Sequence, residues 1–178
     1  MVPALLDAVQ FEQGEHQGFY DQTSDRWFKI TLAGKAGFVL RARDPVEGVA
    51  GNFEARLATP LEYLERIRLA NEKFGDDIRF LGVIDAPDGW RLVTSQANLP
   101  GPAPTQREVL QFFRWHKFRA VNEKTYYRAI DNVLVGDAHT GNLKNVRDGG
   151  IIPFDVLLCQ PDAALRRCVE ARETLSFD

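Results

Sequence analysis

Several features that mark secreted, membrane or nucleic-acid-binding proteins are scarce in this sequence. It contains only two cysteines, Cys159 and Cys168, which form no Cys-x-x-Cys motif, so we expect reduced thiols and no disulfide framework. With 22 basic and 25 acidic residues the formal net charge is −3, which leaves no basic excess to attract nucleic acid or an anionic membrane. No apolar run approaches the roughly 18 residues of a membrane span, and the N-terminus lacks a basic start. We therefore expect a cytoplasmic protein with neither a nucleic-acid nor a membrane partner.

The composition that remains is that of an ordinary globular protein. Its 178 residues are 44 % hydrophobic and 26 % charged, which suits one domain or two small lobes that share a cleft. Periodicity and turn residues predict strands over 26–32, 37–42, 78–84 and 90–96, and helices over 60–74, 105–118 and 162–175. Because the strands and helices are segregated along the chain, we predict an α+β fold.

Capping residues define the first two predicted helices. Thr59 followed by Pro60 is a typical helix start, and Gly75 is a typical helix end. Thr105 and Glu108 stand in capping-box positions at the start of the second helix. We expect the aromatic residues of this second helical segment to lie in the core. These residues are Phe112, Phe113, Trp115 and Phe118.

Proline and glycine mark the expected boundaries. Residues 43–58 are predicted as a loop, and residues 97–104 contain three prolines, as a connector between lobes often does. We therefore expect an upper lobe over 1–96, an antiparallel sheet with one helix. A short and mostly helical lower lobe is expected over 105–178, and within it residues 133–135, 141–146 and 151–158 are predicted to form a polar hairpin.

The segment "VGDAHTGNLKNVRDGGIIPFDVL" carries the most informative spacing. Asp137 is followed five positions later by Asn142, and Asp155 comes thirteen positions after that. These intervals resemble the catalytic loop and metal-binding aspartate of the protein-kinase-like superfamily. The stretch "GDAHTGNL" is similar to the GDxHxGN loop of aminoglycoside phosphotransferases. From about residue 14 to residue 156 the chain resembles the kinase-like domains of bacterial polyvalent proteins, which phages and other mobile elements carry.

The resemblance implies ATP- and magnesium-dependent phosphoryl transfer to an unidentified hydroxyl, on a small molecule or a protein. Asp137 would orient or deprotonate the acceptor, while Asn142 and Asp155 would hold the magnesium ion. His139 is expected to brace the loop by hydrogen bonds. Gly136 and Gly141 would let the backbone approach the phosphates.

The upstream part of such a site would contact the nucleotide. Lys29, on a predicted strand, would contact the α- and β-phosphates, with Arg41 and Lys35 as rivals. Glu65 of the following helix would pair with that lysine, and Glu62 is the alternative; both could instead pair with arginines of their own helix.

Two further stretches complete the expected nucleotide site. Gly14 and Gly18 would lie in a hairpin that covers the phosphates. The adenine would contact the chain near Gln96 and Asn98, chiefly through backbone groups. An ordinary turn is the alternative interpretation of the glycine pair.

Departures from the kinase pattern leave other functions open. Val135 and Gly136 stand where protein kinases have His-Arg, Asp155 is followed by Val156, and only 23 residues come after Asp155. The chain could therefore be a pseudokinase that binds a nucleotide or a partner without catalysis, or a purely structural interaction domain. In the simplest alternative, Asp137 and Asn142 merely close turns in a hairpin.

Overall fold

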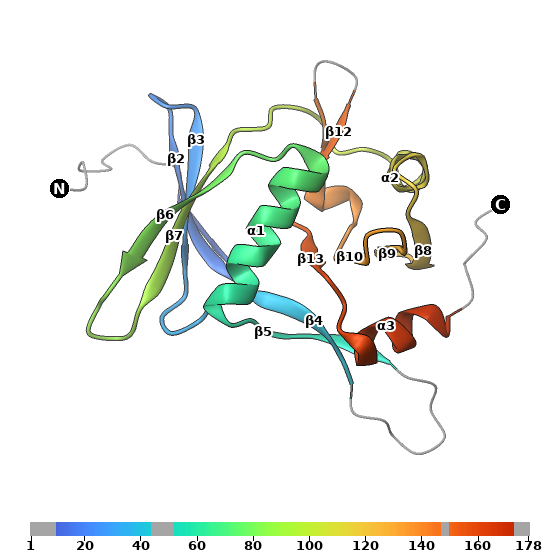
Figure 1. The fold of residues 1–178 in the computed structure, drawn as a ribbon. Helices are drawn as coiled ribbons and strands as arrows, with labels where there is room; N and C mark the ends of the chain where they lie inside the picture. Colours follow the sequence, from blue (N-terminus) through green and yellow to red (C-terminus); the bar gives the residue numbers. More distant parts are fainter. Residues whose placement is uncertain (1–9, 44–51, 147–149, 173–178) are drawn as a thin grey trace. The chain divides into compact units, whose positions relative to one another are not determined.

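The computed structural model describes residues 10–43, 52–146 and 150–172, and it is an α+β structure built mainly from antiparallel sheets (Figure 1). The chain forms two compact units. The first consists of Met1–Phe38 and Leu57–Asn98, and the second of Val39–Arg56 and Leu99–Asp178.

The first unit contains a five-stranded antiparallel sheet in the order β1-β2-β3-β7-β6. Its strands are β1 Gln10–Gln13, β2 His16–Asp21, β3 Arg26–Thr31, β6 Ile78–Ile84 and β7 Arg91–Ala97. The predicted strands over 26–32, 78–84 and 90–96 are thus confirmed. Aromatic and β-branched residues favour extended backbone in these segments, and short turns join β1 to β2, β2 to β3 and β6 to β7.

The helix α1, Pro60–Phe74, packs on this sheet (Figure 1) and has the predicted bounds. Thr59 and Glu62 form a capping box at its start, and Gly75 ends it in the left-handed conformation with φ 68°. Tyr63 and Ile67 are buried together with Leu92 of β7. Local capping therefore sets the helix ends, and its apolar face sets how it packs.

A buried ion pair fastens the first hairpin to α1. Arg66 Nη1 donates to Glu15 Oε2 at 2.7 Å, and the two side chains are only 10 % and 13 % exposed. His16 Nε2 lies 2.9 Å from the hydroxyl oxygen of Tyr63. Because a buried charge without a partner is very unfavourable, this pair holds the β1–β2 turn in place against the helix.

The second unit contains the four-stranded antiparallel sheet β13-β10-β9-β8, two smaller strand pairs and two α-helices. The four strands are β8 Arg119–Asn122, β9 Thr125–Arg128, β10 Val133–Gly136 and β13 Leu157–Cys159. The strand pairs are β4 Phe38–Ala42 with β5 Phe53–Leu57, and β11 Leu143–Asn145 with β12 Ile151–Pro153. The end residues Phe38 and Leu57 of the first pair fall in the first unit. The helices are α2 Gln106–Trp115 and α3 Ala163–Glu170, with a 3-10 turn, η1, at Thr140–Asn142.

The expectation of a mostly helical lower lobe is wrong. The polar hairpin predicted within this lobe contains the strands β10, β11 and β12. The strands β8 and β9, of four residues each, are too short to show a period in the sequence, so sheet pairing alone reveals them. The central strand β10 is completely buried at Val133, Leu134 and Val135 because it has neighbours on both edges.

The aromatic residues of α2 are only partly in the core. Phe113 is fully buried and stacks on Tyr126 with ring centroids 4.0 Å apart, as predicted for a core residue. Trp115, by contrast, is 83 % exposed, so its assignment to the core is wrong. The helix ends at Trp115, where the chain turns into a left-handed Lys117, so the helical face does not continue to that position.

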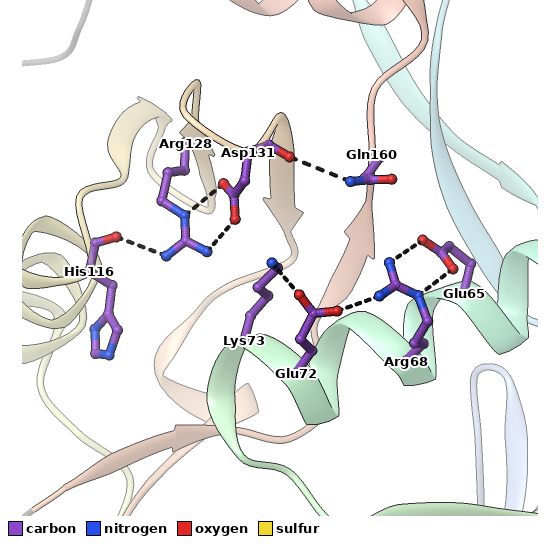
Figure 2. A network of polar contacts seen from close by, with 8 residues as sticks. All are labelled: Glu65, Arg68, Glu72, Lys73, His116, Arg128, Asp131 and Gln160. Atoms are coloured by element: carbon purple, nitrogen blue, oxygen red, sulfur yellow. Dashed lines mark hydrogen bonds and ion pairs between the residues drawn. The ribbon is translucent and has the colours of Figure 1, made fainter.

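Polar contacts join the end of α2 to the β9–β10 turn (Figure 2). Arg128 binds both carboxylate oxygens of Asp131 at 2.8 Å and donates to the carbonyl oxygen of His116 at 3.1 Å. Gln160 Nε2 donates to the carbonyl oxygen of Asp131 at 3.5 Å. These contacts stabilise the second unit away from its candidate functional loop.

The segment between β4 and α1 differs from its prediction. Residues 53–57, expected as part of a loop, form the strand β5. The described parts of Val39–Arg56 belong to the second unit, although the sequence placed them in the upper lobe. Leu40 of β4 packs over Gly136, where a Cβ atom would lie 2.6 Å from Leu40 Cδ1.

The later junction between the units, Asn98 to Leu99, falls in the predicted connector. Among the helices that the structure describes, none is both long enough and apolar enough to cross a membrane.

Candidate functional site

Strand pairing in the second unit brings Asp137 and Asp155 to the same end of a sheet. Gly136, the last residue of β10, pairs with Leu157, the first residue of β13. Asp137 therefore follows one member of this pair directly, and Asp155 precedes the other by two residues. Both aspartates therefore lie at the same end of the β10–β13 pair.

The neighbouring hairpin brings Asn142 to this point as well. Leu143 of β11 pairs with Pro153 of β12, and the backbone N–H of Phe154 donates to the carbonyl oxygen of Asn142 at 3.0 Å. Asp155 is the next residue after Phe154. The three residues that the sequence singled out are thus gathered by two adjoining strand pairs.

A direct contact fixes the side chain of Asn142. Its Nδ2 donates to the backbone carbonyl of Asp137 at 2.9 Å and to the carboxylate Oδ2 of Asp137 at 3.0 Å. Because both partners are acceptors, the amide nitrogen must face Asp137 and the amide oxygen must face away. Within the described residues Asn142 Oδ1 accepts no hydrogen bond, so it is available as an oxygen ligand.

Asp137 itself sits in an unusual backbone conformation. Its φ is 53°, in the left-handed region that aspartate enters more readily than most residues. The next residue, Ala138, is fully buried and its N–H donates to the carbonyl of Lys124 at 2.9 Å. This buried anchor holds the loop while the Asp137 side chain stays exposed.

His139 braces this loop, as predicted. Its Nδ1 accepts a hydrogen bond from the backbone N–H of Gly141 at 3.1 Å, which starts the 3-10 turn. Its Nε2 lies 3.7 Å from Asp137 Oδ1. Since Nδ1 accepts, a neutral ring carries its proton on Nε2, on the side of Asp137.

The two loop glycines have packing reasons of their own. A Cβ atom on Gly141 would lie 2.9 Å from Cε1 of His139, and Gly136 accommodates Leu40 as described above. Their expected closeness to phosphates stays a prediction.

The oxygen atoms of this loop suit a magnesium ion that arrives with a nucleotide. Asn142 Oδ1 and the Asp155 carboxylate are hard oxygen donors. No three His, Cys, Asp or Glu side chains of the described residues are grouped as metal ligands. Magnesium typically uses one or two carboxylates and takes its other ligands from phosphates and water, so the donors present fit such an ion.

In the first unit Lys29 lies on β3, directly opposite Gly18 of β2 and Thr94 of β7. Side chains alternate along a strand, so Lys29 shares a sheet face with Gln96, two residues further along β7. The positive charge of Lys29 acts on Asp76 and lowers the pKa of that carboxyl group. Lys29 is thus placed beside Asp76 and Gln96.

Asp76 is a buried carboxylate that the sequence did not single out. It is 6 % exposed, and Gln96 Nε2 donates to its two carboxylate oxygens at 2.9 and 2.8 Å. Burial raises the pKa of Asp76 to about 6, although Gln96 and Lys29 act in the opposite direction. The sequence signal was the pair of aspartates in "FGDDIRF", directly after the helix cap and at the entry to β6.

The expected pairing of Glu65 with Lys29 is replaced by a pair within the helix. Glu65 binds Arg68 through two hydrogen bonds of 2.7 and 2.8 Å (Figure 2), and Arg68 lowers the pKa of Glu65. Arg68 also contacts Glu72, which accepts from Lys73. The alternative, Glu62, closes the capping box at the helix start.

The remaining predicted contacts have structural partners inside the first unit. Gly14 has φ 62° in the turn of the β1–β2 hairpin, so the hairpin itself is confirmed. Asn98 accepts from Trp27 Nε1 at 3.2 Å and donates to Asp25 Oδ1 at 3.0 Å, and Gln96 is held by Asp76. Any adenine contact at these positions would therefore use backbone groups.

The two rival cations differ in their surroundings. Arg41 lies in the second unit, where its Nη1 is 3.4 Å from Asp162 Oδ2, whereas Lys35 is exposed in the turn after β3. Lys29 is the candidate with a buried acidic neighbour.

Comparison with protein-family models, with curated proteins and with solved structures finds no match to this chain. A function must therefore be argued from its own residues.

Proposed function

We propose that this chain is a kinase-like phosphotransferase that uses ATP and magnesium to phosphorylate a hydroxyl group. The observation that carries the proposal is the fixed arrangement of Asp137, Asn142 and Asp155. Phosphoryl transfer needs a carboxylate at the acceptor and oxygen ligands for the cation, and these three residues supply both chemistries at the end of two strand pairs.

Each residue has a distinct part in the proposed reaction. Asp137 accepts the proton of the acceptor hydroxyl, whose oxygen forms a bond to the γ-phosphorus while the bond from that phosphorus to the bridging oxygen of ADP breaks. Asn142 Oδ1 and Asp155 would hold the cation, which neutralises charge on the phosphates when it is bound. His139 keeps Asp137 and the turn in place.

The first unit supports the same proposal. In protein kinases the lysine that contacts the α- and β-phosphates lies on the third strand, and a helix that follows carries its acidic partner. Here Lys29 lies on the third strand of an antiparallel sheet, and α1 follows later in the chain.

Calorimetry with ATP tests the proposal. We expect binding that requires magnesium and that weakens about tenfold or more in Asp155→Ala, because a cation ligand is lost. Asp85→Ala, at an exposed aspartate directly after β6, is the matched control and is expected to bind as the wild type does. Absence of ATP binding to the wild-type protein would refute the proposal.

A second candidate function is a pseudokinase, a nucleotide- or partner-binding module without catalysis. The observation that favours it is the commitment of Glu65 to Arg68, because active protein kinases require the pair between lysine and helix glutamate. Tight ATP binding without release of ADP or transfer to any hydroxyl acceptor, and unchanged in Asp137→Asn, would favour this candidate.

A further inference from the structure

The carboxylate of Asp76 is buried and hydrogen-bonded at both oxygens, although the sequence did not place this residue in the expected site. It comes directly after Gly75, the residue that ends α1, and it is nearly inaccessible to solvent. The Gln96 amide donates to both of its oxygens. A buried carboxylate is unfavourable in its charged form. We therefore expect a nearby cationic partner that stabilises the charge of Asp76.

Lys29 is that partner. The register of β3 and β7 puts Lys29 and Gln96 on one face of the sheet, and the charge of Lys29 acts on Asp76. Asp77, the next residue, is turned to the arginines Arg26 and Arg79. The two adjacent aspartates therefore interact with different cations: Asp77 with the two arginines, and the buried Asp76 with Lys29.

We propose that Asp76, clamped by Gln96, is the positioning residue that orients the Lys29 ammonium toward the phosphates of a nucleotide. This role rests on the function proposed above and assigns to Asp76 the part that the sequence assigned to Glu65. A short buried side chain with both oxygens fixed defines the position of the lysine better than a long exposed one would, because less rotamer freedom remains.

The role implies a dependence on pH. The charged groups that act on Asp76 are Lys29, which favours the carboxylate, and Asp77, which opposes it, while burial raises the pKa of Asp76 to about 6. Above that pH the carboxylate is charged and orients the ammonium. Below it the orientation is lost, so ATP affinity should fall with acidification in the wild type more than in Asp76→Asn, where the protonation of ATP itself still contributes.

Chemical labelling of Lys29 tests the contact without any nucleotide. Acylation by an amine-reactive ester, measured by mass spectrometry at pH 8, reports how readily the Lys29 amine reacts. Asp76→Asn keeps the size of the side chain and removes its charge, so we expect Lys29 to react about tenfold faster, because the negative charge that holds its ammonium group is gone. Glu65→Gln and Asp85→Asn should leave the rate within about twofold.

Calorimetry with ATP and magnesium tests the role. We expect Asp76→Asn to weaken binding about tenfold, Asp76→Glu to restore part of the loss, and Glu65→Gln to bind as the wild type does. Wild-type affinity in Asp76→Asn, or loss of affinity in Glu65→Gln alone, would overturn the positioning role while the proposed function stands. A wild-type protein that binds no ATP would overturn the proposed function. The labelling rates of Lys29 would still show whether Asp76 interacts with that lysine.

Discussion

The two groups of candidate residues are held in opposite ways. In the first unit Asp76 and Gln96 are buried and bonded to each other, whereas in the second unit Asp137 is exposed on a short loop. The buried group is built from residues far apart in the sequence, whereas Asp137 and its hydrogen-bond partner Asn142 are only five positions apart. Burial gives the first group its altered acidity, and a compact loop gives the second its geometry.

The largest expected effect concerns the buried ion pair of the first unit. Arg66→Ala would leave the nearly buried Glu15 carboxylate without its arginine and should lower the free energy of unfolding by about 3–5 kcal/mol. Arg68→Ala, two positions away on the exposed side of the same helix, should lower it by less than about 1 kcal/mol. Urea denaturation of both variants measures the difference, and equal losses would contradict the contrast between buried and exposed pairs.

The next effect is a pH dependence that originates from Asp76. Since its folded-state pKa is raised from 3.8 to about 6, its stabilising contribution is complete below about pH 4 and is lost as the pH rises to about 6. The loss amounts to roughly 3 kcal/mol at about 1.4 kcal/mol per pKa unit.

Other carboxylates have lowered pKa values, so their contributions to stability change with pH in the opposite direction. The contribution of Asp76 must therefore be measured against a variant that lacks only its charge. Asp77 is one of them, because Arg79 and Arg26 lower its pKa. The difference in unfolding free energy between the wild type and Asp76→Asn, measured at pH 4 and pH 7, isolates the contribution of Asp76. A difference that does not change between these two values would be incompatible with a raised pKa.

A smaller effect is expected at Gly136, the glycine before the loop that carries Asp137. Gly136→Ala would place a Cβ atom 2.6 Å from Leu40 Cδ1 in a buried strand, which should lower stability by about 1–3 kcal/mol. In a double-mutant cycle with Leu40→Ala, which is destabilising by itself because Leu40 is buried, the added cost of Gly136→Ala should be smaller than in the wild type, because the opposing methyl groups are then absent. Thermal denaturation of the single and double variants provides the measurement.

The smallest effect on stability is expected at the exposed loop. Asn142→Ala removes two hydrogen bonds to Asp137 near the surface and should cost about 1 kcal/mol. Its effect on ATP binding with magnesium should be larger, about tenfold, because the proposed cation ligand is lost. A variant that is strongly destabilised but binds ATP normally would show that Asn142 only closes a turn.

Local signals predicted much of the fold. Thr59, Pro60 and Gly75 define both ends of α1 in the sequence, because capping depends on residues within a few positions of the helix end. The predicted polar hairpin contains β10, β11 and β12, but the strands β5, β8 and β9 were missed, since a strand of four or five residues is stabilised by its partners rather than by its own pattern.

The candidate site also has one part that local sequence determined and one part that only the tertiary structure decided. Asp137, His139 and Asn142 belong to one loop, so their spacing in the sequence determines that they meet, and the hydrogen bonds among them follow from that spacing. The partner of Lys29 was decided only by the tertiary structure. Asp76 reaches the lysine because the sheet places β3 beside β7 and the end of α1 returns the chain to that sheet, and no local pattern encodes a contact between residues so far apart.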